Sequence, residues 1–132
     1  MEREPLLVVD AANVVGSRPD GWWRDRAGAN ARLRDSLAPL ARSGWAELSA
    51  PVEVVLVVEG AARRTAPVDG VRVVRADSSG DDAIVELVGA EPAGRRRVVV
   101  VTADRELRRQ VPELGAEDGA PTWLRSAPSR PD

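Results

Sequence analysis

Residues 6–14 read LLVVDAANV, which is four apolar side chains in a row followed by Asp10, two alanines and Asn13. A run that is apolar at every position indicates a strand buried on both faces, as in a parallel sheet. Residues 52–58 and 98–101 repeat this pattern, and residues 71–74 give a shorter candidate. The sequence therefore predicts four strands, most of them fully buried.

Three segments between or after these strands have helical spacing. Residues 23–42 place three leucines on one face, although Pro39 inside the pattern predicts a kink or an early end. Residues 81–88 begin with two acids, which suit the positive end of a helix dipole, and residues 103–111 form the third helix. Strands that alternate with helices predict an α/β fold with a parallel sheet covered on both faces.

The length of the chain suits one domain. A chain of 132 residues is long enough for one buried core, and we assign residues 1–125 to a single domain. Residues 126–132 are expected to form a frayed tail. No stretch has the features of a signal peptide or the length of a membrane span, so we expect a cytoplasmic protein.

The composition excludes several kinds of chemistry. The chain has no cysteine, histidine, tyrosine or lysine. Thiolate sites, disulfides, histidine bases, the usual zinc ligands and lysine Schiff bases are therefore all excluded. Catalysis must depend on carboxylates, arginine, hydroxyl or amide groups, or a metal ion. The net charge of −2 means that contact with nucleic acid would depend on local patches of arginine.

Acidic side chains follow the ends of several predicted elements. Asp10, Glu59 and Asp104 come at or soon after strands, and Asp81 and Asp82 begin a helix. Taken singly, each has an ordinary reading as a turn former, a helix cap or a solvated side chain. Taken together, they converge, because the carboxyl ends of parallel strands meet at one edge of the sheet. Carboxylates so close together would repel one another unless a hard cation such as Mg²⁺ or Mn²⁺ bound between them. Such an ion can activate water and neutralise charge on a phosphoryl group.

The ordered set of motifs resembles a known family. The D-x-x-N opening at residues 10–13, the acids of residues 80–84 and the T-x-D of residues 102–104 are similar, in order and spacing, to motifs of the NYN branch of PIN-like nucleases. The resemblance spans residues 6–111, and the bacterial YacP-like group is the most similar within that class. It implies a PIN-like three-layer α/β/α fold with a central, mostly parallel sheet.

The resemblance also implies an activity, which is metal-dependent and endonucleolytic cleavage of RNA. By the match of motifs, Asp10, Asp81 and Asp104 would be the catalytic and metal-binding carboxylates, with Asp82 as the substitute second acid. Asn13 and Thr102 would support the site by hydrogen bonds. Two departures from the family follow from the sequence. Glu59 stands where the family often has aspartate, and residues 116–119 are too polar for the buried final strand that the family leads us to expect.

Arginine clusters are the candidate contacts to RNA. Arg105 and Arg109 are four residues apart, on one helix face beside Asp104, and Arg63 with Arg64 forms another cluster. Solvated arginine that binds nothing is the competing interpretation of each cluster. We expect RNA as the partner and no membrane. The resemblance leaves open association with the ribosome or another RNA complex, as well as the oligomeric state.

Other classes that gather acids at strand ends fit less well. A phosphate-receiver domain normally uses a lysine, and a dinucleotide-binding domain needs glycines after its first strand. Residues 57–60 resemble the glutamate motif of Toprim domains, but the D-x-D that should follow is missing. Small PIN-domain toxins usually lack the asparagine of the first motif. The main alternative is a PIN-like domain without catalysis that binds RNA or a protein.

Overall fold

The computed structural model describes residues 4–12, 26–44, 48, 50–59, 65–76, 80–91 and 96–119. The strands within these ranges are β1 (Leu6–Asp10), β2 (Glu53–Val58), β3 (Val71–Arg75), β4 (Val98–Val101) and β5 (Glu117–Gly119). The helices are α2 (Arg26–Ser43), α3 (Gly80–Gly89), α4 (Arg105–Gln110) and the short 3-10 helix η3 (Pro112–Leu114). No helix in these ranges is both long and apolar enough to cross a membrane.

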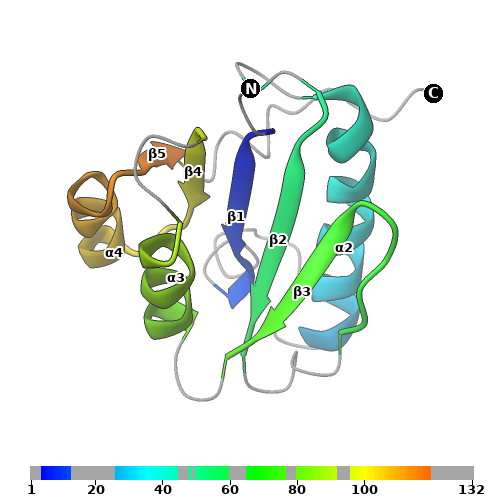
Figure 1. Cartoon of the computed structure of the whole chain (residues 1–132). Coiled ribbons are helices and arrows are strands. Elements are labelled where there is room, and N and C mark those ends of the chain that lie inside the picture. The colour runs from blue at the N-terminus through cyan, green and yellow to red at the C-terminus, as the bar shows by residue number, and fades with distance from the viewer. Residues whose placement is uncertain are drawn as a thin grey trace.

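The five strands form one parallel sheet in the order β3-β2-β1-β4-β5 (Figure 1). The central strand β1 pairs with β2 on one side and with β4 on the other. The chain therefore winds outward from β1 to β3 and then returns to start again beside β1. In open α/β sheets, such a reversal of strand order leaves a crevice at the carboxyl ends of the two strands concerned, and ligands bind there.

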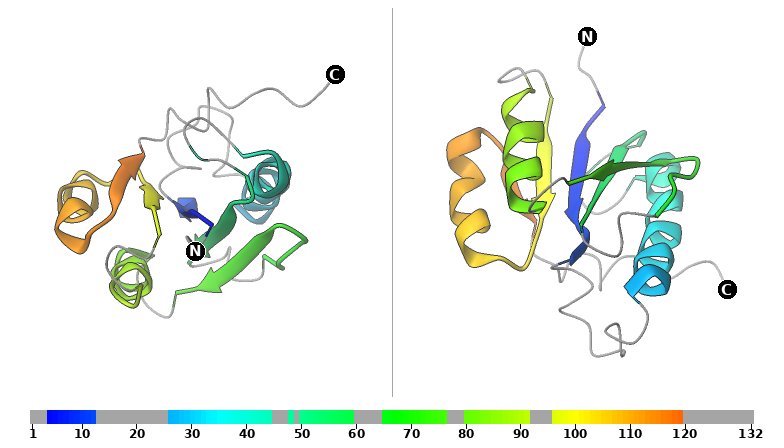
Figure 2. Two further views of the ribbon diagram at one scale, coloured as in Figure 1. Left: turned by 45° about the horizontal axis from the view of Figure 1, so that its top comes forward. Right: turned by 90° about the horizontal axis from the view of Figure 1, so that it is seen from below.

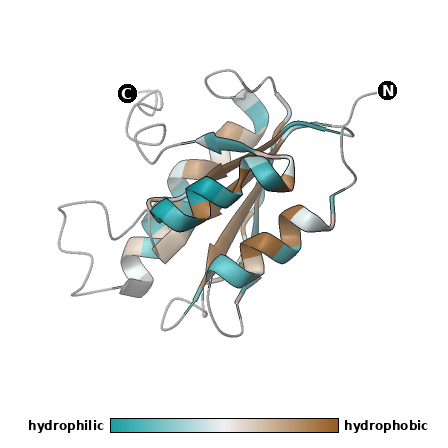
Figure 3. Ribbon diagram, turned by 90° about the vertical axis from the view of Figure 1, so that its left-hand side faces the viewer, coloured by the Kyte–Doolittle hydropathy of each residue, from teal (hydrophilic) through white to brown (hydrophobic). Residues whose placement is uncertain are grey.

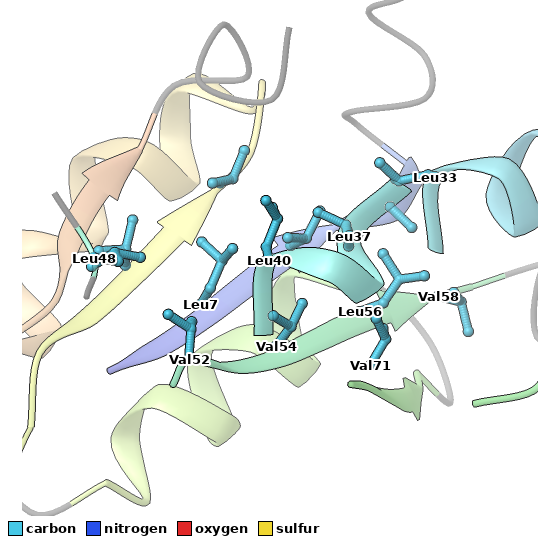
Figure 4. Packing of buried hydrophobic residues seen from close by; sticks show 14 of the residues in the cluster. Leu7, Leu33, Leu37, Leu40, Leu48, Val52, Val54, Leu56, Val58 and Val71 are labelled. Atoms are coloured by element: carbon cyan, nitrogen blue, oxygen red, sulfur yellow. The ribbon is translucent and has the colours of Figure 1, made fainter. Parts of the chain in front are cut away.

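Helices cover the sheet on both faces, and the alternation of side chains along the strands divides the core in two. On β1, Leu7 and Val9 belong to the cluster packed against α2 (Figure 4), whereas Leu6 and Val8 belong to the cluster beneath α3 and α4. Figure 2 shows α2 on one side of the sheet and α3 with α4 on the other. The predicted three-layer α/β/α architecture and the buried parallel strands are thus confirmed.

Helix α2 continues through Pro39 to Ser43, so the early end that the proline suggested does not occur. Its leucines at positions 33, 37 and 40 are buried against the sheet, while Pro39 is exposed. Burial of a leucine side chain stabilises by about 1.5–3 kcal/mol, which offsets the backbone hydrogen bond that proline cannot donate. Helix α2 is followed by Gly44, whose positive φ of 73° suits the left-handed turn after a helix. The predicted start near residue 23 lies outside the described residues.

The final strand β5 exists, although the polarity of residues 116–119 had argued against it. Its two acids are exposed at the edge of the sheet and are held by arginines from neighbouring elements. Arg97 donates to Glu117 over 2.8 Å, and Arg108 donates to Asp118 over 2.9 Å. The Arg97 hydrogen bond lowers the pKa of Glu117. The expectation failed because it assumed a buried strand, and an edge strand can satisfy charged side chains outside the core.

A buried arginine links several elements at the amino ends of the strands, opposite the end that carries the acids. The Arg96 side chain is only 4% exposed. It donates to Glu53 on β2 over 2.7 Å and to both oxygens of Glu91, beyond α3, over 2.8 and 2.9 Å. One guanidinium group therefore links the residues just before β4 to the start of β2 and to the segment after α3. Arg96 therefore lies at the amino end of β4, away from the acids that follow the strands.

Replacing Arg96 with alanine is expected to lower the free energy of unfolding by about 3 kcal/mol, because two partly buried carboxylates lose their shared partner. Urea unfolding followed by circular dichroism measures the change. Arg72→Ala is the matched control, since Arg72 is 60% exposed and lies 3.6 Å from the same Glu53. The control should cost less than about 1 kcal/mol. Equal losses in the two variants would contradict the role given to Arg96.

Candidate metal and RNA site

Four acidic residues from four elements meet at the carboxyl edge of the sheet, beside the reversal of strand order. Asp10 is the last residue of β1, and Glu59 directly follows β2. Asp81 lies in the first turn of α3, and Asp104 caps the start of α4 after β4. Their charges act on one another, because Asp10, Glu59 and Asp104 all raise the pKa of Asp81. Residues up to 94 positions apart in the sequence thus share one electrostatic environment.

The centre of the site is a hydrogen bond between two neighbouring strands. The Thr102 hydroxyl donates to Asp10 Oδ2 over 2.8 Å, and both side chains are buried. The same hydroxyl oxygen accepts the backbone N–H of Asp104 over 3.1 Å. Thr102 therefore orients the Asp10 carboxylate and positions the start of α4 at the same time. A supporting role for Thr102 at a metal site stays a prediction.

Asp104 has a structural task that favours its charged form. Its Oδ1 accepts the backbone N–H of Leu107 over 3.1 Å, as a helix N-cap does. This hydrogen bond lowers the pKa of Asp104, and a hydrogen bond from Asp81 acts in the same direction. Asp104 therefore keeps its negative charge at neutral pH and presents it to Asp81.

Asp81 has the opposite shift. Its pKa rises from 3.8 to about 6, first because the side chain is partly desolvated, then because of the hydrogen bond to Asp104 and the charges of Asp104, Asp10 and Glu59. The two aspartates thus form a pair in which Asp81 takes up a proton readily and Asp104 does not. Desolvation is the largest cause of the raised pKa of Asp81, and the neighbouring negative charges add to it.

Glu59 holds the start of α3 in place. Its Oε2 accepts the backbone N–H of Gly80, the first residue of the helix. A Cβ atom at Gly80 would lie 2.6 Å from Glu59 Oε2 and 3.5 Å from Asp10 Oδ1. A side chain at position 80 would therefore require the Glu59 carboxylate to move. The contact also sets Asp81, the next residue, at the edge that carries Asp10.

The remaining predicted site residues lie in several surroundings. Asp82 is exposed, and its charge is not among the causes of the Asp81 shift. Arg105 and Arg109 are exposed on α4, where Arg109 forms an ion pair with Glu106. Asn13, Arg63 and Arg64 lie outside the described residues. Within the described ranges, no three acidic side chains are arranged as a ready metal-binding set.

Two features of the site were not predicted from the sequence. The close approach of Glu59 to Gly80 is visible only in the folded chain, although a glycine directly before two acids at a helix start is a usable signal. The pairing of Arg108 with Asp118 depends on strand β5, which the polarity of that segment had argued against.

A single parallel sheet in the order β3-β2-β1-β4-β5, with helices on both faces and acids at the reversal point, is a three-layer α/β/α architecture. Among solved structures, the chain is similar to Rae1 (YacP) from Bacillus subtilis, with a TM-score of 0.73 and 18% identity over 90% of this chain and 70% of that chain. A point mutant of the same protein gives a TM-score of 0.68 and 19% identity over 94% and 72%. No family model and no curated protein matches the sequence. The chain therefore has the YacP fold, and the predicted likeness to that group is confirmed at the level of the fold.

Replacing Asp81 with asparagine is expected to stabilise the protein at pH 7.5 without divalent ions by roughly 1 kcal/mol, after allowance for solvent screening. The folded state binds the Asp81 proton more tightly than the unfolded state does, because the folded pKa of about 6 exceeds 3.8. Stability is therefore lost as the pH rises from about 4 to 6, and the substitution should help only above this window.

Urea unfolding in EDTA at pH 4 and pH 7.5 measures this difference. Asp82→Asn is the control, because both acids lie in the first turn of α3 and share the effect of the helix dipole. An equal response of the two variants at pH 7.5 would show that the neighbouring carboxylates do not destabilise Asp81.

Replacing Gly80 with alanine is expected to cost about 1–2 kcal/mol, because the new methyl group displaces the Glu59 carboxylate from the N–H that it accepts. Gly89→Ala is the control at the other end of the same helix, where a Cβ meets no atom within 4 Å. That control should be neutral or stabilising by up to about 1 kcal/mol, because alanine favours helix more than glycine does. Thermal unfolding compares the two, and equal melting temperatures would argue against the contact.

Proposed function

We propose that the protein is a metal-dependent ribonuclease that hydrolyses phosphodiester bonds within RNA at the carboxyl edge of the sheet. The observation that supports this proposal most is the placement of Asp10, Glu59 and Asp104 around Asp81, whose pKa is raised to about 6 first by desolvation and then by these three acids. Such crowding of like charges destabilises a fold unless a cation binds there. The YacP fold supports the same conclusion, because the motifs of residues 10–13, 80–84 and 102–104 occur in the nucleases of this class in the same order.

The donor set fits a hard divalent cation, either Mg²⁺ or Mn²⁺. Every candidate ligand is a carboxylate oxygen, which these ions prefer, and histidine and cysteine are absent from the chain. Asp10, Asp81 and Asp104 would hold the ion, with Asp82 as the substitute for Asp81. When bound, it supplies a nucleophile from water at neutral pH and neutralises charge on the phosphoryl group.

The protein's own residues orient this site. Thr102 fixes the direction of the Asp10 carboxylate and holds the backbone of Asp104. Glu59 fixes the start of α3 and so determines where Asp81 lies. The family resemblance also implies a supporting hydrogen bond from Asn13. Support of this kind reduces the reorganisation that binding of an ion and a substrate would require.

RNA is the proposed substrate, and arginine side chains would bind its phosphates. Arg105 begins α4 directly after Asp104, and Arg109 lies one turn further along the helix. Arg63 and Arg64 would contribute from the segment after β2. Because the chain has a net charge of −2, its affinity for RNA should be modest and should fall steeply with salt.

The alternative function is a PIN-like domain that binds RNA or a protein without catalysis. One observation favours it, which is that no three acids in the described parts of the chain form a ready metal-binding set. The two functions differ in their need for metal. A catalytic domain must bind Mn²⁺ or Mg²⁺ through Asp10, whereas a binding module need not.

The test incubates purified protein with a mixture of single-stranded and structured RNA, with Mn²⁺ or with EDTA. We expect cleavage only with the metal, and Asp10→Asn should reduce the rate at least 100-fold, since metal ligands and their immediate partners contribute effects of this size. Gly89→Ala, which is remote from the acids, should retain the rate of the wild-type protein. Equal cleavage by Asp10→Asn and wild type would assign the activity to a contaminant or another site.

A direct measurement of metal binding separates the two functions. Isothermal titration with Mn²⁺ should give a binding heat for the wild-type protein and none for Asp10→Asn. Absence of both metal binding and cleavage in the wild-type protein would reject the nuclease proposal and leave the binding module.

A further inference from the structure

A hollow of about 510 Å³ is lined by residues of helix α4 and strand β5. Among the described residues, those that line it are Arg105, Arg108, Arg109 and Asp118, and we call it the arginine hollow. Because the hollow is broadly open to solvent, it suits a chain that lies along the surface. In Figure 3, which faces this side of the molecule, the ribbon of α4 is mostly hydrophilic.

The three arginines of the hollow are not equally engaged. Arg108 donates through Nε to both carboxylate oxygens of Asp118, over 3.2 and 2.9 Å. Arg109 pairs with Glu106, but both side chains are more than two-thirds exposed, so the pair contributes little. Arg105 is exposed and forms no ion pair with any residue in the described ranges. Two guanidinium groups are therefore readily available to an anion, and the third is held by Asp118.

We propose that the arginine hollow binds the phosphodiester backbone of an RNA strand beside the segment that lies at the acids, and that Asp118 limits the strength of this binding by holding Arg108. This inference rests on the proposed function, since it names the part of the protein that holds the substrate of that site. Guanidinium groups bind phosphate oxygens through paired hydrogen bonds. Contacts to phosphate position a strand and do not read its sequence.

The location of the hollow supports this role. Arg105 directly follows Asp104, so the hollow and the acidic edge are joined through the first turn of α4. Arg105 and Arg109 lie about 6 Å apart along the helix axis, which lets them contact different phosphates of one strand. In an RNA strand that runs from the hollow to the acids, arginines would bind the phosphates of one segment, and the adjoining segment would reach the carboxylates.

The experiment measures binding without cleavage. Every variant is made in the Asp10→Asn background and titrated in EDTA with a fluorescent single-stranded RNA of mixed sequence, at several salt concentrations. Arg105→Gln should weaken binding about fivefold at low salt and reduce the salt slope by roughly 0.7, the value for one lost contact to a single strand. Arg108→Gln should have a smaller effect, because Asp118 already holds that arginine.

Asp118→Asn gives the sharper prediction, because it should strengthen binding several-fold and steepen the salt dependence by releasing Arg108. Glu117→Gln is the matched control, since this neighbour on β5 pairs with Arg97 instead. Glu117→Gln should change the affinity by less than twofold. Arg72→Gln, on the outer strand β3 at the other side of the sheet from β5, should also change it by less than twofold. Circular dichroism verifies that β5 variants remain folded, and Arg105→Gln tests the hollow without touching that strand.

Each outcome decides between the proposals. Unchanged affinity in Arg105→Gln and Asp118→Asn would overturn the arginine hollow, and metal-dependent cleavage by the wild-type protein would leave the nuclease proposal intact. Weaker binding by Arg105→Gln in a chain that never cleaves RNA would keep the hollow and reject the nuclease. Equal competition by a polyglutamate peptide of the same charge would assign the hollow to acidic proteins and overturn the RNA proposal.

Discussion

The hydrogen bond from Thr102 to Asp10 is the interaction on which the site depends. It joins the ends of β1 and β4, the two strands between which the winding of the sheet reverses. Both groups are buried at the end of a core made almost wholly of valine and leucine. A carboxylate in such surroundings is costly unless it is hydrogen-bonded, so the threonine makes the buried acid tolerable and also fixes its direction.

The other acids follow from the same strand order. Because the strands are parallel, Glu59 after β2 and the residues that lead from β4 to Asp104 lie at the same end of the sheet as Asp10. Helix α3 begins at this end as well, because the chain leaves β3 there. Two of these acids perform helix capping, which gives each a local stabilising role despite the repulsion between them. The concentration of charge is therefore built into the folded backbone and does not depend on flexible surface side chains.

The sequence predicted the fold well because the buried strands are long runs of valine and leucine that alternate with helices. The bounds of β4 were predicted exactly as they occur, and β1, β2 and α3 differ by a residue or two at their ends. The acids at the strand ends could be placed together because a parallel sheet has only one carboxyl edge. Such reasoning could not show that Glu59 contacts Gly80, because that contact depends on side-chain direction and not on the order of elements.

Pro39 and β5 show where local patterns misled the prediction. At Pro39, the packing of one helix face outweighs a local preference, and at β5 the ion pairs replace an apolar pattern that the sequence lacks. In both places, long-range contacts decided the outcome, and a window of neighbouring residues does not contain them.

The charged composition of β5 also affects how the molecule behaves in a crowded solution. A sheet ending in a long apolar strand offers its free backbone groups to other chains and promotes association of edges. This sheet ends, within its described part, in a strand of three residues whose two acids are fixed in place by arginines. A strand of a second molecule that paired with β5 would have to lie beside two carboxylates that are already bound to Arg97 and Arg108. The same ion pairs that form the strand thus protect the protein from self-association at that edge.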